Sequence, residues 1–405
     1  MLGWRACSFV NARVVTPHGE ARSIRFRRRV LALDEVPQSG DHVVDLDGRF
    51  VLPGLVNAHD HLELNHYGEL KCRKRYGNAR EWIDDLRPVI RSNNEVRAKS
   101  RINLRDRLFI GGLKNLLAGV TTVAHHNPIY SAFGCQFPVR LVERFGWAHS
   151  LGMEHAPVGA HGEPGGVVAE RAAATPAHQP FIVHAAEGVD TVAAQEIHEL
   201  NASDSLRPNT VIVHGVAVSI PRWQELFARG VSLVWCPRSN MFLFGQTVCM
   251  QRLVQVPGAH GRIGLGTDSR VTGSRDLLSE LRVAADLGVS PDHLLAMVTS
   301  WAASVLRLDD AGCTRIGAAA DLTVVPANAK TAAEALLKCE RGDLDLVVRR
   351  GTPIVGSPFL RPAFATRGIH FRRIDVDGRE RLIQAGFARR IERCTIEEPG
   401  VHVLR

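Results

Sequence analysis

The feature that most constrains this chain is an apolar run that ends in two histidines spaced two positions apart. Residues 51–56 are almost entirely apolar, and His59 and His61 follow closely. On a β-strand, alternate side chains point to the same face, so these two imidazoles share one face. Two imidazoles on one rigid face suit the start of a metal site. Paired histidines also occur on solvated strands, so the pair alone does not decide between the two interpretations.

Three later segments also read as buried strands that end in a residue able to bind a metal or move a proton. They end in His184, His214 and Asp268, and Glu187 follows three residues after His184. Catalytic residues gathered at the carboxyl ends of several strands are typical of a (β/α)8 barrel. Three histidines with one carboxylate suit a divalent metal such as zinc.

With these segments identified, the sequence resembles the amidohydrolase superfamily, in its metal-dependent deaminase and chlorohydrolase branch. That branch includes cytosine, adenosine and guanine deaminases. The matching segments follow the family's order over most of the chain and are residues 53–62, 184–187, 214–215, 236–240, 266–269 and 316–322. The resemblance implies an α/β fold, namely a distorted, TIM-like (β/α)8 barrel with a small β-sandwich domain formed from both chain ends.

The order of predicted elements favours the same organisation. Short strands and turns fill the first fifty residues, and a helix-sized amphipathic segment starts only near Asn94. Strands then alternate with helices, as in parallel α/β proteins. Two barrel strands are expected between residues 151 and 180, but only 145–151 reads clearly as a strand, with 157–162 as an abbreviated candidate. The predicted domains are residues 1–52 (first part of the sandwich), 53–311 (barrel) and 312–405 (second part and C-terminal extension).

The resemblance also implies a role for each strand-end residue. The implied ligands of one divalent metal are His59, His61, His184 and Asp268. Zinc is favoured, with iron and manganese as alternatives. A metal lowers the pKa of bound water to about 7, and Asp268 is implied to accept the water's proton. Glu187 then protonates the substrate and His214 steadies the tetrahedral intermediate. From residue chemistry alone, Glu187 equally suits a helix N-terminus, and His214 could be a hydrogen-bonded core residue.

Several other polar residues near the strand ends are candidate substrate contacts. They are Glu63, Trp82, His126, Asn240 and Arg270. Structural interpretations stay open for them, since His126 could cap a turn, Asn240 could shape its loop and Arg270 could lie on the surface.

These observations predict a metal-dependent hydrolase of carbon–nitrogen bonds other than peptide bonds. The favoured reaction is deamination of an amino-substituted purine, pyrimidine, nucleoside or triazine by metal-bound hydroxide. Hydrolysis of an amide, an imine or a chloro-substituted ring on the same site stays open. A non-catalytic binding protein on a decayed barrel is disfavoured by the complete ligand set. The chain lacks the Pro-Cys-x-x-Cys motif of the other zinc deaminase class and a phosphate-binding loop.

The composition predicts a cytoplasmic protein whose partner is a small molecule. Eight scattered cysteines without a Cys-x-x-Cys pair fit a reducing compartment. The first residues lack the apolar core of a signal peptide, and no apolar run approaches a membrane span. The net charge of +8 invites a nucleic-acid partner, but no basic block carries a nucleic-acid-binding motif. We therefore expect no nucleic-acid or membrane partner, and a homodimer stays open.

Overall fold

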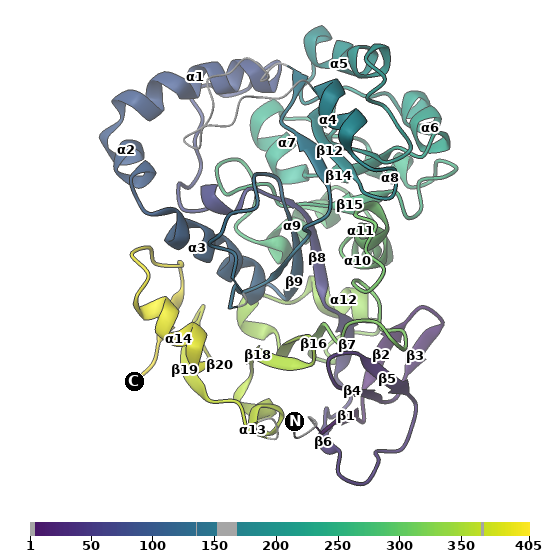
Figure 1. Ribbon diagram of the computed structural model, residues 1–405, viewed down its shortest axis with the longest axis vertical. Coiled ribbons are helices and arrows are strands. Elements are labelled where there is room, and N and C mark those ends of the chain that lie inside the picture. The colour runs from purple at the N-terminus through teal and green to yellow at the C-terminus, as the bar shows by residue number, and fades with distance from the viewer. Residues whose placement is uncertain (1–4, 135, 152–167, 366–367) are drawn as a thin grey trace.

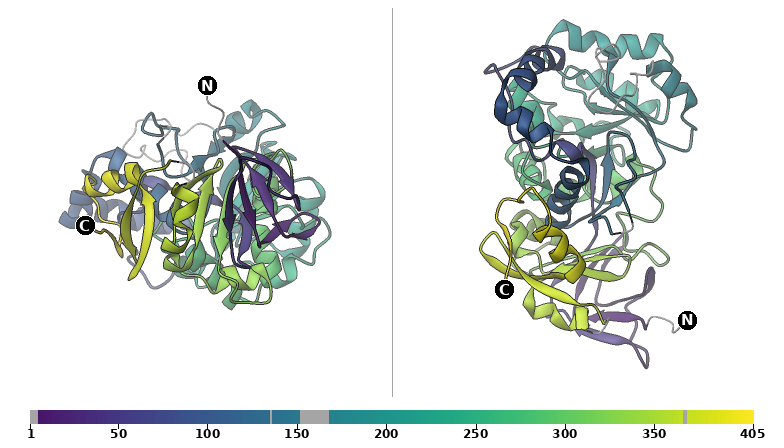
Figure 2. Two further views of the ribbon diagram at one scale, coloured as in Figure 1. Left: turned by 90° about the horizontal axis from the view of Figure 1, so that it is seen from below. Right: turned by 60° about the vertical axis from the view of Figure 1, so that its left-hand side comes forward.

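The computed structural model describes residues 5–134, 136–151, 168–365 and 368–405. Its fold is mixed α/β, with parallel strands and helices at the top of Figure 1 and sheets from both chain ends at the bottom. Both termini lie at this lower end (Figure 2). Within the described ranges, no helix combines the length and the apolar character needed to cross a membrane.

Eight parallel strands form the α/β part, in two sheets ordered β10-β9-β8 and β11-β12-β13-β14-β15. Their bounds are Leu55–Asp60 (β8), Val120–His125 (β9), Arg140–Leu141 (β10), Gly146–Ala148 (β11), Phe181–Ala185 (β12), Thr210–His214 (β13), Ser232–Trp235 (β14) and Ile263–Leu265 (β15). In the part of the chain that the structure describes, no backbone ladder joins β10 to β11 or β15 to β8. Because the strands within each sheet are parallel, their carboxyl ends share one edge.

Helices follow most of these strands. Their bounds are Ala79–Ser92 (α1), Asn94–Ser100 (α2), Leu104–Leu117 (α3), Val168–Ala174 (α4), Thr191–Ala202 (α5), Ile220–Ala228 (α6), Pro237–Phe244 (α7), Met250–Leu253 (α8), Leu277–Asp286 (α9), Pro291–Met297 (α10), Ser300–Val305 (α11), Ala332–Leu337 (α12), Arg361–Ala365 (α13) and Ala385–Glu392 (α14). Side chains of the preceding residues cap several N-termini. Ser219 Oγ accepts from the Arg222 N–H at the start of α6.

One helix boundary differs from the sequence-based prediction. Helix α1 starts at Ala79, well before Asn94, although it contains Pro88, a residue that normally ends a helix. Helix α9 starts after Asp276, whose Oδ1 atom accepts the Ser279 N–H at 2.9 Å.

Strands from both chain ends form two further sheets, ordered β5-β4-β1-β6 and β21-β19-β20-β18-β17-β16-β7-β2-β3. The bounds are Cys7–Val10 (β1), Arg13–Thr16 (β2), Gly19–Ala21 (β3), Ile24–Phe26 (β4), Val30–Leu33 (β5), His42–Asp45 (β6), Phe50–Pro53 (β7), Leu322–Val325 (β16), Leu346–Arg349 (β17), Thr352–Gly356 (β18), Phe371–Val376 (β19), Arg379–Gln384 (β20) and Val401–Val403 (β21). Phe9 and Phe26 of one sheet and Val51 and Leu322 of the other share one buried cluster, so the two sheets pack together.

The segment before β12 departs from the expected pair of strands. Strand β11 confirms the strand predicted over 145–151, and the short β10 precedes it. The described residues between 151 and 180 contain α4 and no strand. The abbreviated strand suggested over 157–162 lies outside the described residues.

A fully buried ion pair links β8 to α3 beside the strand ends. Lys114 Nζ lies 3.1 Å from Asp60 Oδ2, and neither side chain is exposed. The same oxygen accepts from Asn115 Nδ2 at 2.8 Å, and Asp60 Oδ1 accepts from Asn65 Nδ2 at 2.8 Å. Hydrogen bonds to both oxygens offset the cost of burying the carboxylate.

The same network reaches the residues that follow β15. Asn57 Nδ2 donates to Thr267 Oγ1 at 2.8 Å, and the Thr267 N–H donates to Asn57 Oδ1 at 3.1 Å. One residue further on, the Asp268 N–H donates to the His59 carbonyl at 3.1 Å. These bonds join the ends of β8 and β15, where the backbone ladder is interrupted.

Substitution Lys114→Met should lower the free energy of unfolding by about 3–5 kcal/mol, because it leaves the buried Asp60 carboxylate without its counter-ion. Urea denaturation followed by circular dichroism measures this change. Lys330→Met is the control, since Lys330 is exposed and the change should stay within about 0.5 kcal/mol. Equal small effects for both substitutions would show that the network does not depend on the ion pair.

Candidate metal centre and active site

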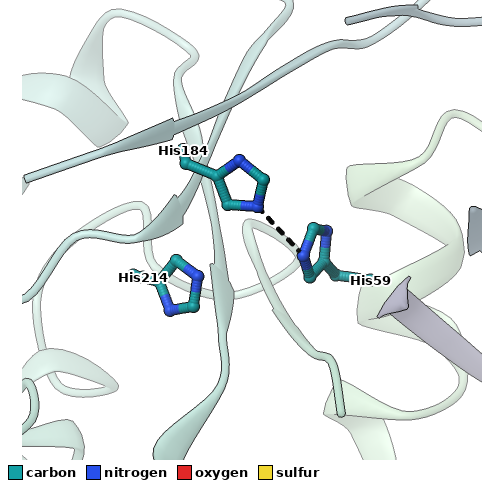
Figure 3. A group of neighbouring side chains, drawn as sticks. All are labelled: His59, His184 and His214. Atoms are coloured by element: carbon teal, nitrogen blue, oxygen red, sulfur yellow. Dashed lines mark hydrogen bonds between the residues drawn. The ribbon is translucent and has the colours of Figure 1, made fainter. Parts of the chain in front are cut away.

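Imidazoles from several strands converge at the carboxyl edge of the two parallel sheets. The Nε2 atom of His184, in β12, lies 3.2 Å from Nε2 of His59, in β8, and 3.4 Å from Nε2 of His61. Figure 3 shows His59 and His184 pointing toward one another, with His214 beside them. Asp268, just after β15, places Oδ1 3.8 Å from the His61 Nε2 atom. The structure therefore brings together all four residues expected to bind a metal.

The spacing of these atoms fits one tetrahedral metal ion. Zinc binds imidazole nitrogen at about 2.0–2.1 Å, so two ligands of a tetrahedral site lie about 3.3 Å apart. The observed Nε2–Nε2 separations of 3.2 and 3.4 Å match that value. The Nδ1 atom of His184 lies 2.9 Å from the His149 carbonyl, which fixes the Nδ1–H tautomer and leaves the Nε2 lone pair free for a metal.

The environment keeps the histidines in the form that binds metals. Burial, followed by the charges of neighbouring imidazoles, holds the pKa of His59 and of His184 well below the usual range. Burial also lowers the pKa of His61, although Asp268 and Asp60 oppose that shift. These side chains are therefore neutral at pH 7, and neutral imidazole is the state that ligates.

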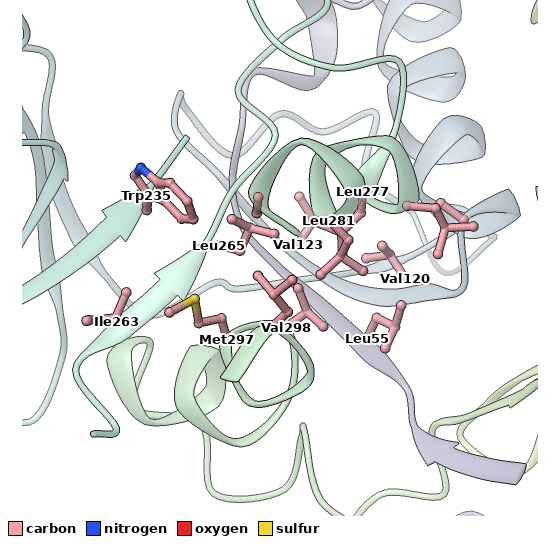
Figure 4. Packing of buried hydrophobic residues seen from close by; sticks show 14 of the residues in the cluster. Leu55, Val120, Val123, Trp235, Ile263, Leu265, Leu277, Leu281, Met297 and Val298 are labelled. Atoms are coloured by element: carbon pink, nitrogen blue, oxygen red, sulfur yellow. The ribbon is translucent and has the colours of Figure 1, made fainter. Parts of the chain in front are cut away.

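The strands that carry the ligands rest on a core of packed aliphatic side chains (Figure 4). Leu55 in β8 and Leu265 in β15 belong to one buried cluster with Leu277 and Leu281 of α9 and Val298 after α10. Such packing removes freedom from the strand ends, because interiors are close-packed and resist displacement. The ligand side chains are thus placed by rigid elements.

Asp268 is oriented by two hydroxyl groups. Its Oδ2 atom accepts from Ser239 Oγ and from Thr272 Oγ1, both at 2.9 Å, while the Ser269 N–H donates to Oδ1 at 2.6 Å. Burial raises the pKa of the carboxyl, but the adjacent imidazoles, led by that of His61, outweigh burial and lower it overall. Asp268 is therefore ionised, with Oδ1 facing the histidines.

Glu187 and His214 form a second pair at the edge of this cluster. Glu187 Oε1 lies 3.6 Å from His214 Nε2. The other ring nitrogen of His214, Nδ1, lies 2.8 Å from Asn240 Oδ1 and donates to it. Burial, aided by the charge of Asp268, raises the pKa of Glu187 to about 7. Glu187 is thus poised to give and take a proton near neutral pH.

The backbone is strained at three of these strand ends. Ala186, His214 and Asp268 have φ values of 52°, 71° and 52°, although none is glycine. Residues held in this left-handed region cost about 1–3 kcal/mol each and concentrate at functional sites. Here they follow or end β12, β13 and β15, where the chain turns to aim the catalytic candidates at one another.

The predicted substrate contacts lie in different surroundings. Asn240 is fully buried, and its amide nitrogen donates to Thr247 Oγ1 at 3.0 Å. It therefore fixes the tautomer of His214 and is not an open substrate contact. Glu63 is buried behind His61, since Asn127 Nδ2 donates to Glu63 and lies 3.2 Å from the Nδ1 atom of His61. Burial raises the pKa of Glu63 to about 7.

Two other predicted contacts are engaged elsewhere. The Trp82 indole donates to the Leu70 carbonyl at 3.0 Å and packs against a small apolar cluster that includes Phe244. Arg270 forms a two-point ion pair with Glu398, at 2.9 and 2.6 Å. Its guanidinium is therefore already paired with a carboxylate, and a substrate contact by Arg270 stays a prediction.

His126 lies next to the candidate ligands, in a group of three imidazoles that includes no carboxylate. Its Nε2 atom lies 2.9 Å from the Ala148 carbonyl, and its buried Nδ1 atom has no partner among the described residues. With His149 and His184 it forms a second close group of nitrogens. Because Nε2 is engaged by the carbonyl, only Nδ1 of His126 is free to face a metal. His59, His61, His184 and Asp268, which include a carboxylate, stay the predicted ligand set.

The sequence interpretation missed several residues around the centre. His149, Thr272 and Lys114 are the main ones. His149 follows β11 as His126 follows β9, so its strand-end position was a usable signal. Lys114, with Asn115, interrupts the leucines at 113, 116 and 117, which also suggests a special role. The contact of Thr272 with Asp268 has no comparable sequence signal.

Candidate ligands of this kind, at the carboxyl edge of parallel sheets, are typical of a metal-dependent hydrolase. The family model described as Amidohydrolase family matches residues 151–352. The chain belongs to the amidohydrolase family, in its deaminase and chlorohydrolase branch, and acts on carbon–nitrogen bonds other than peptide bonds. One divalent metal, consistent with zinc, completes its site.

Similar proteins of known sequence and structure agree with this assignment. A 5-methylthioadenosine/S-adenosylhomocysteine deaminase from Natronomonas pharaonis is 27% identical over 72% of this chain and 76% of its own length. One from Thermococcus sibiricus is 24% identical over 73% and 78%. The zinc complex of atrazine chlorohydrolase from Arthrobacter aurescens has a TM-score of 0.65 at 18% identity, covering 89% of this chain and 99% of that one. A zinc-bound adenosine deaminase from Xanthomonas campestris has a TM-score of 0.64 at 17% identity, covering 90% and 97%.

The ligand assignment predicts one bound divalent ion per chain after equilibration with zinc. His59→Ala and His184→Ala should each weaken binding by more than the roughly 10–100-fold that changes outside the ligand set cause. His149→Ala should retain the ion, since that side chain belongs only to the second group. Elemental analysis after dialysis measures the metal content. Loss of the ion in His149→Ala with retention in His59→Ala would instead place the metal in the second group.

Proposed function

We propose that this protein hydrolytically deaminates an amino-substituted heterocycle, such as a purine, pyrimidine, nucleoside or triazine. The observation that carries the proposal is the placement of Glu187 at 3.6 Å from His214, beside four converging metal ligands. A carboxyl group with a pKa of about 7 can protonate a ring nitrogen and then give a proton to a departing amine. Relatives named as deaminases support this reaction over other hydrolyses.

The proposed ligands are His59, His61, His184 and Asp268. A divalent metal held there supplies a Lewis acid that lowers the pKa of water enough for attack at neutral pH. Asp268 Oδ1 faces the ligand cluster and takes the proton of the attacking water. Its other oxygen is held by the hydroxyls of Ser239 and Thr272, so the accepting atom keeps its direction.

Glu187 and His214 act on the substrate side of this cluster. Protonated Glu187 donates to the ring nitrogen next to the carbon that bears the amino group. The Nδ1–H of His214 is held by Asn240, so its Nε2 atom stays turned toward Glu187 and the reacting centre. The carbon–nitrogen bond then breaks as the amino group takes the proton that Asp268 accepted from the water, and it leaves as ammonia. The proton of the added hydroxyl passes to Glu187 and restores its acid form. His126, whose Nδ1 lone pair lacks a partner among the described residues, is the remaining candidate for a substrate contact.

The fold supports the same proposal. We propose that the two parallel sheets together form the wall of a distorted (β/α)8 barrel over residues 53–311. Hydrogen bonds from Asp268 and Thr267 to β8 support closure on one side. The sheets built from residues 1–52 and 312–405 would form the flanking β-sandwich, since both chain ends contribute to one nine-stranded sheet.

The direct test is ammonia release from a panel of aminopurines, aminopyrimidines, nucleosides and aminotriazines, with zinc-loaded protein of known metal content. Release from one compound that is abolished by metal removal would establish deamination and its substrate class. If no compound of the panel releases ammonia while one metal is bound per chain, deamination is refuted. Hydrolysis of an amide, an imine or a chloro-substituted ring on this site would then be the remaining reaction.

Glu187→Gln should keep the bound metal and lower kcat by about 10²–10⁴-fold, because the amide cannot shuttle a proton. Turnover of the panel substrate and metal content would be measured on the same preparation. Glu199→Gln is the matched control, since Glu199 is exposed on α5 and its substitution should leave both values unchanged. An active Glu187→Gln variant would remove Glu187 from the mechanism.

The pH dependence should show that Glu187 acts in its protonated form. Burial raises its pKa to about 7, so the active acid is present below that pH and is lost as pH rises through it. A bound cation favours the carboxylate and moves this loss to lower pH. We expect kcat/KM to fall on the alkaline side of a profile measured from pH 5 to pH 9. A rise over that whole range would contradict the assignment of Glu187 as the acid.

A further inference from the structure

A buried ion-pair cluster joins the C-terminal part of the chain to the loop that carries Asp268. Glu398 is only 2% exposed, and its carboxylate accepts from Arg270 Nη2 at 2.6 Å and Nη1 at 2.9 Å. Arg341, which is also buried, donates to Glu398 Oε1 at 2.5 Å. Glu398 therefore binds two guanidinium groups, and one of them comes from the loop between β15 and α9.

Arg270 is held on its other side by groups that belong to the site. The backbone N–H of Arg270 donates to Asn65 Oδ1 at 3.1 Å, and the same oxygen accepts from Lys114 Nζ at 2.6 Å. Its Nε atom donates to the Arg275 carbonyl at 2.8 Å, which closes the loop on itself. Arg270 thus lies between the buried network around Asp60 and the C-terminal segment, two residues after Asp268.

This pairing is better suited to fixing geometry than to adding stability. A buried ion pair contributes little more, and often less, than packed apolar side chains of similar volume. A two-point arginine–carboxylate pair, in contrast, fixes both distance and direction. Other contacts also hold the C-terminal part of the chain in place. They include those of Arg341 with Asp377 at 2.8 and 3.0 Å. Arg275 of the same loop also contacts Asp377 and donates to the Pro399 carbonyl at 3.0 Å, but Glu398 contacts Arg270, which lies only two residues after Asp268.

We propose that Glu398 is a positioning residue for the hydrolysis, and that it acts through Arg270 to hold Asp268 Oδ1 toward the metal ligands. The proposal rests on the proposed function of this site. It extends the active-site apparatus to a residue more than a hundred positions after Asp268 and outside the segment that matches the family.

Glu398→Gln tests the proposal because it keeps the side-chain volume and removes the charge that holds both guanidinium groups. We expect kcat to fall roughly 10- to 100-fold, as small displacements of catalytic groups do, with KM and metal content unchanged. Glu380→Gln is the matched control. Glu380 forms the same two-point pair, with Arg373 at 2.8 and 2.7 Å, but on the exposed surface of the same part of the chain.

Two further measurements separate positioning from loss of fold. In cobalt-loaded protein, the visible absorption of the metal should change in Glu398→Gln and not in Glu380→Gln, since Asp268 is a proposed ligand. If Glu398 acts through Arg270, the effects of Glu398→Gln and Arg270→Gln on kcat should be non-additive in the double variant.

The proposal would be overturned by an unchanged kcat and cobalt spectrum in Glu398→Gln, by equal effects in Glu380→Gln, or by additive effects in the double variant. The cobalt spectrum also makes the two proposals separable. If the wild-type protein releases no ammonia from any compound, deamination fails, while the spectrum still reports whether Glu398 positions Asp268.

Discussion

The buried pair of Asp60 and Lys114 is the interaction on which the site depends. Asp60 lies between His59 and His61, so the bonds that fix its carboxylate also fix the position of the end of β8, where both imidazoles lie. A buried charge needs every available hydrogen bond, and here the partners come from β8, from α3 and from the segment after β15. The cost of leaving that carboxylate unpaired holds these elements in a single arrangement.

Burial and hydrogen bonding also decide which carboxyl groups of the site are charged and which are neutral. Burial alone would protonate every carboxyl group, and it does raise the pKa of Glu187. The pKa of Asp268 is lowered instead, because its carboxylate faces the imidazoles, led by that of His61, and it also accepts hydrogen bonds from two hydroxyls. The pKa values of two carboxyl groups in one site are therefore shifted in opposite directions, which suits Asp268 to act as a base and Glu187 as an acid.

The sequence was sufficient for the parts of the structure that depend on local patterns. Buried strands ending in His59, His184, His214 and Asp268 were readable because apolar runs and their polar ends are contiguous in the chain. Contacts between distant residues left no such pattern. The pairing of Arg270 with Glu398 spans 128 positions, and an isolated arginine reads equally well as a substrate contact. Helix α1 was missed because it contains Pro88, a residue that normally ends a helix, and because Leu86 is its only buried residue.

The interruption of the parallel ladder has a consequence for the mechanics of the protein. His59 lies in a strand of the three-stranded sheet and His61 follows that strand, whereas His184 lies in a strand of the five-stranded sheet and Asp268 follows another. An ion bound by all four residues would add a direct link between the sheets to the hydrogen bonds that join the ends of β8 and β15. Amide hydrogen exchange would then slow across both sheets when the ion binds, and the affinity for the ion would set how far the exchange slows.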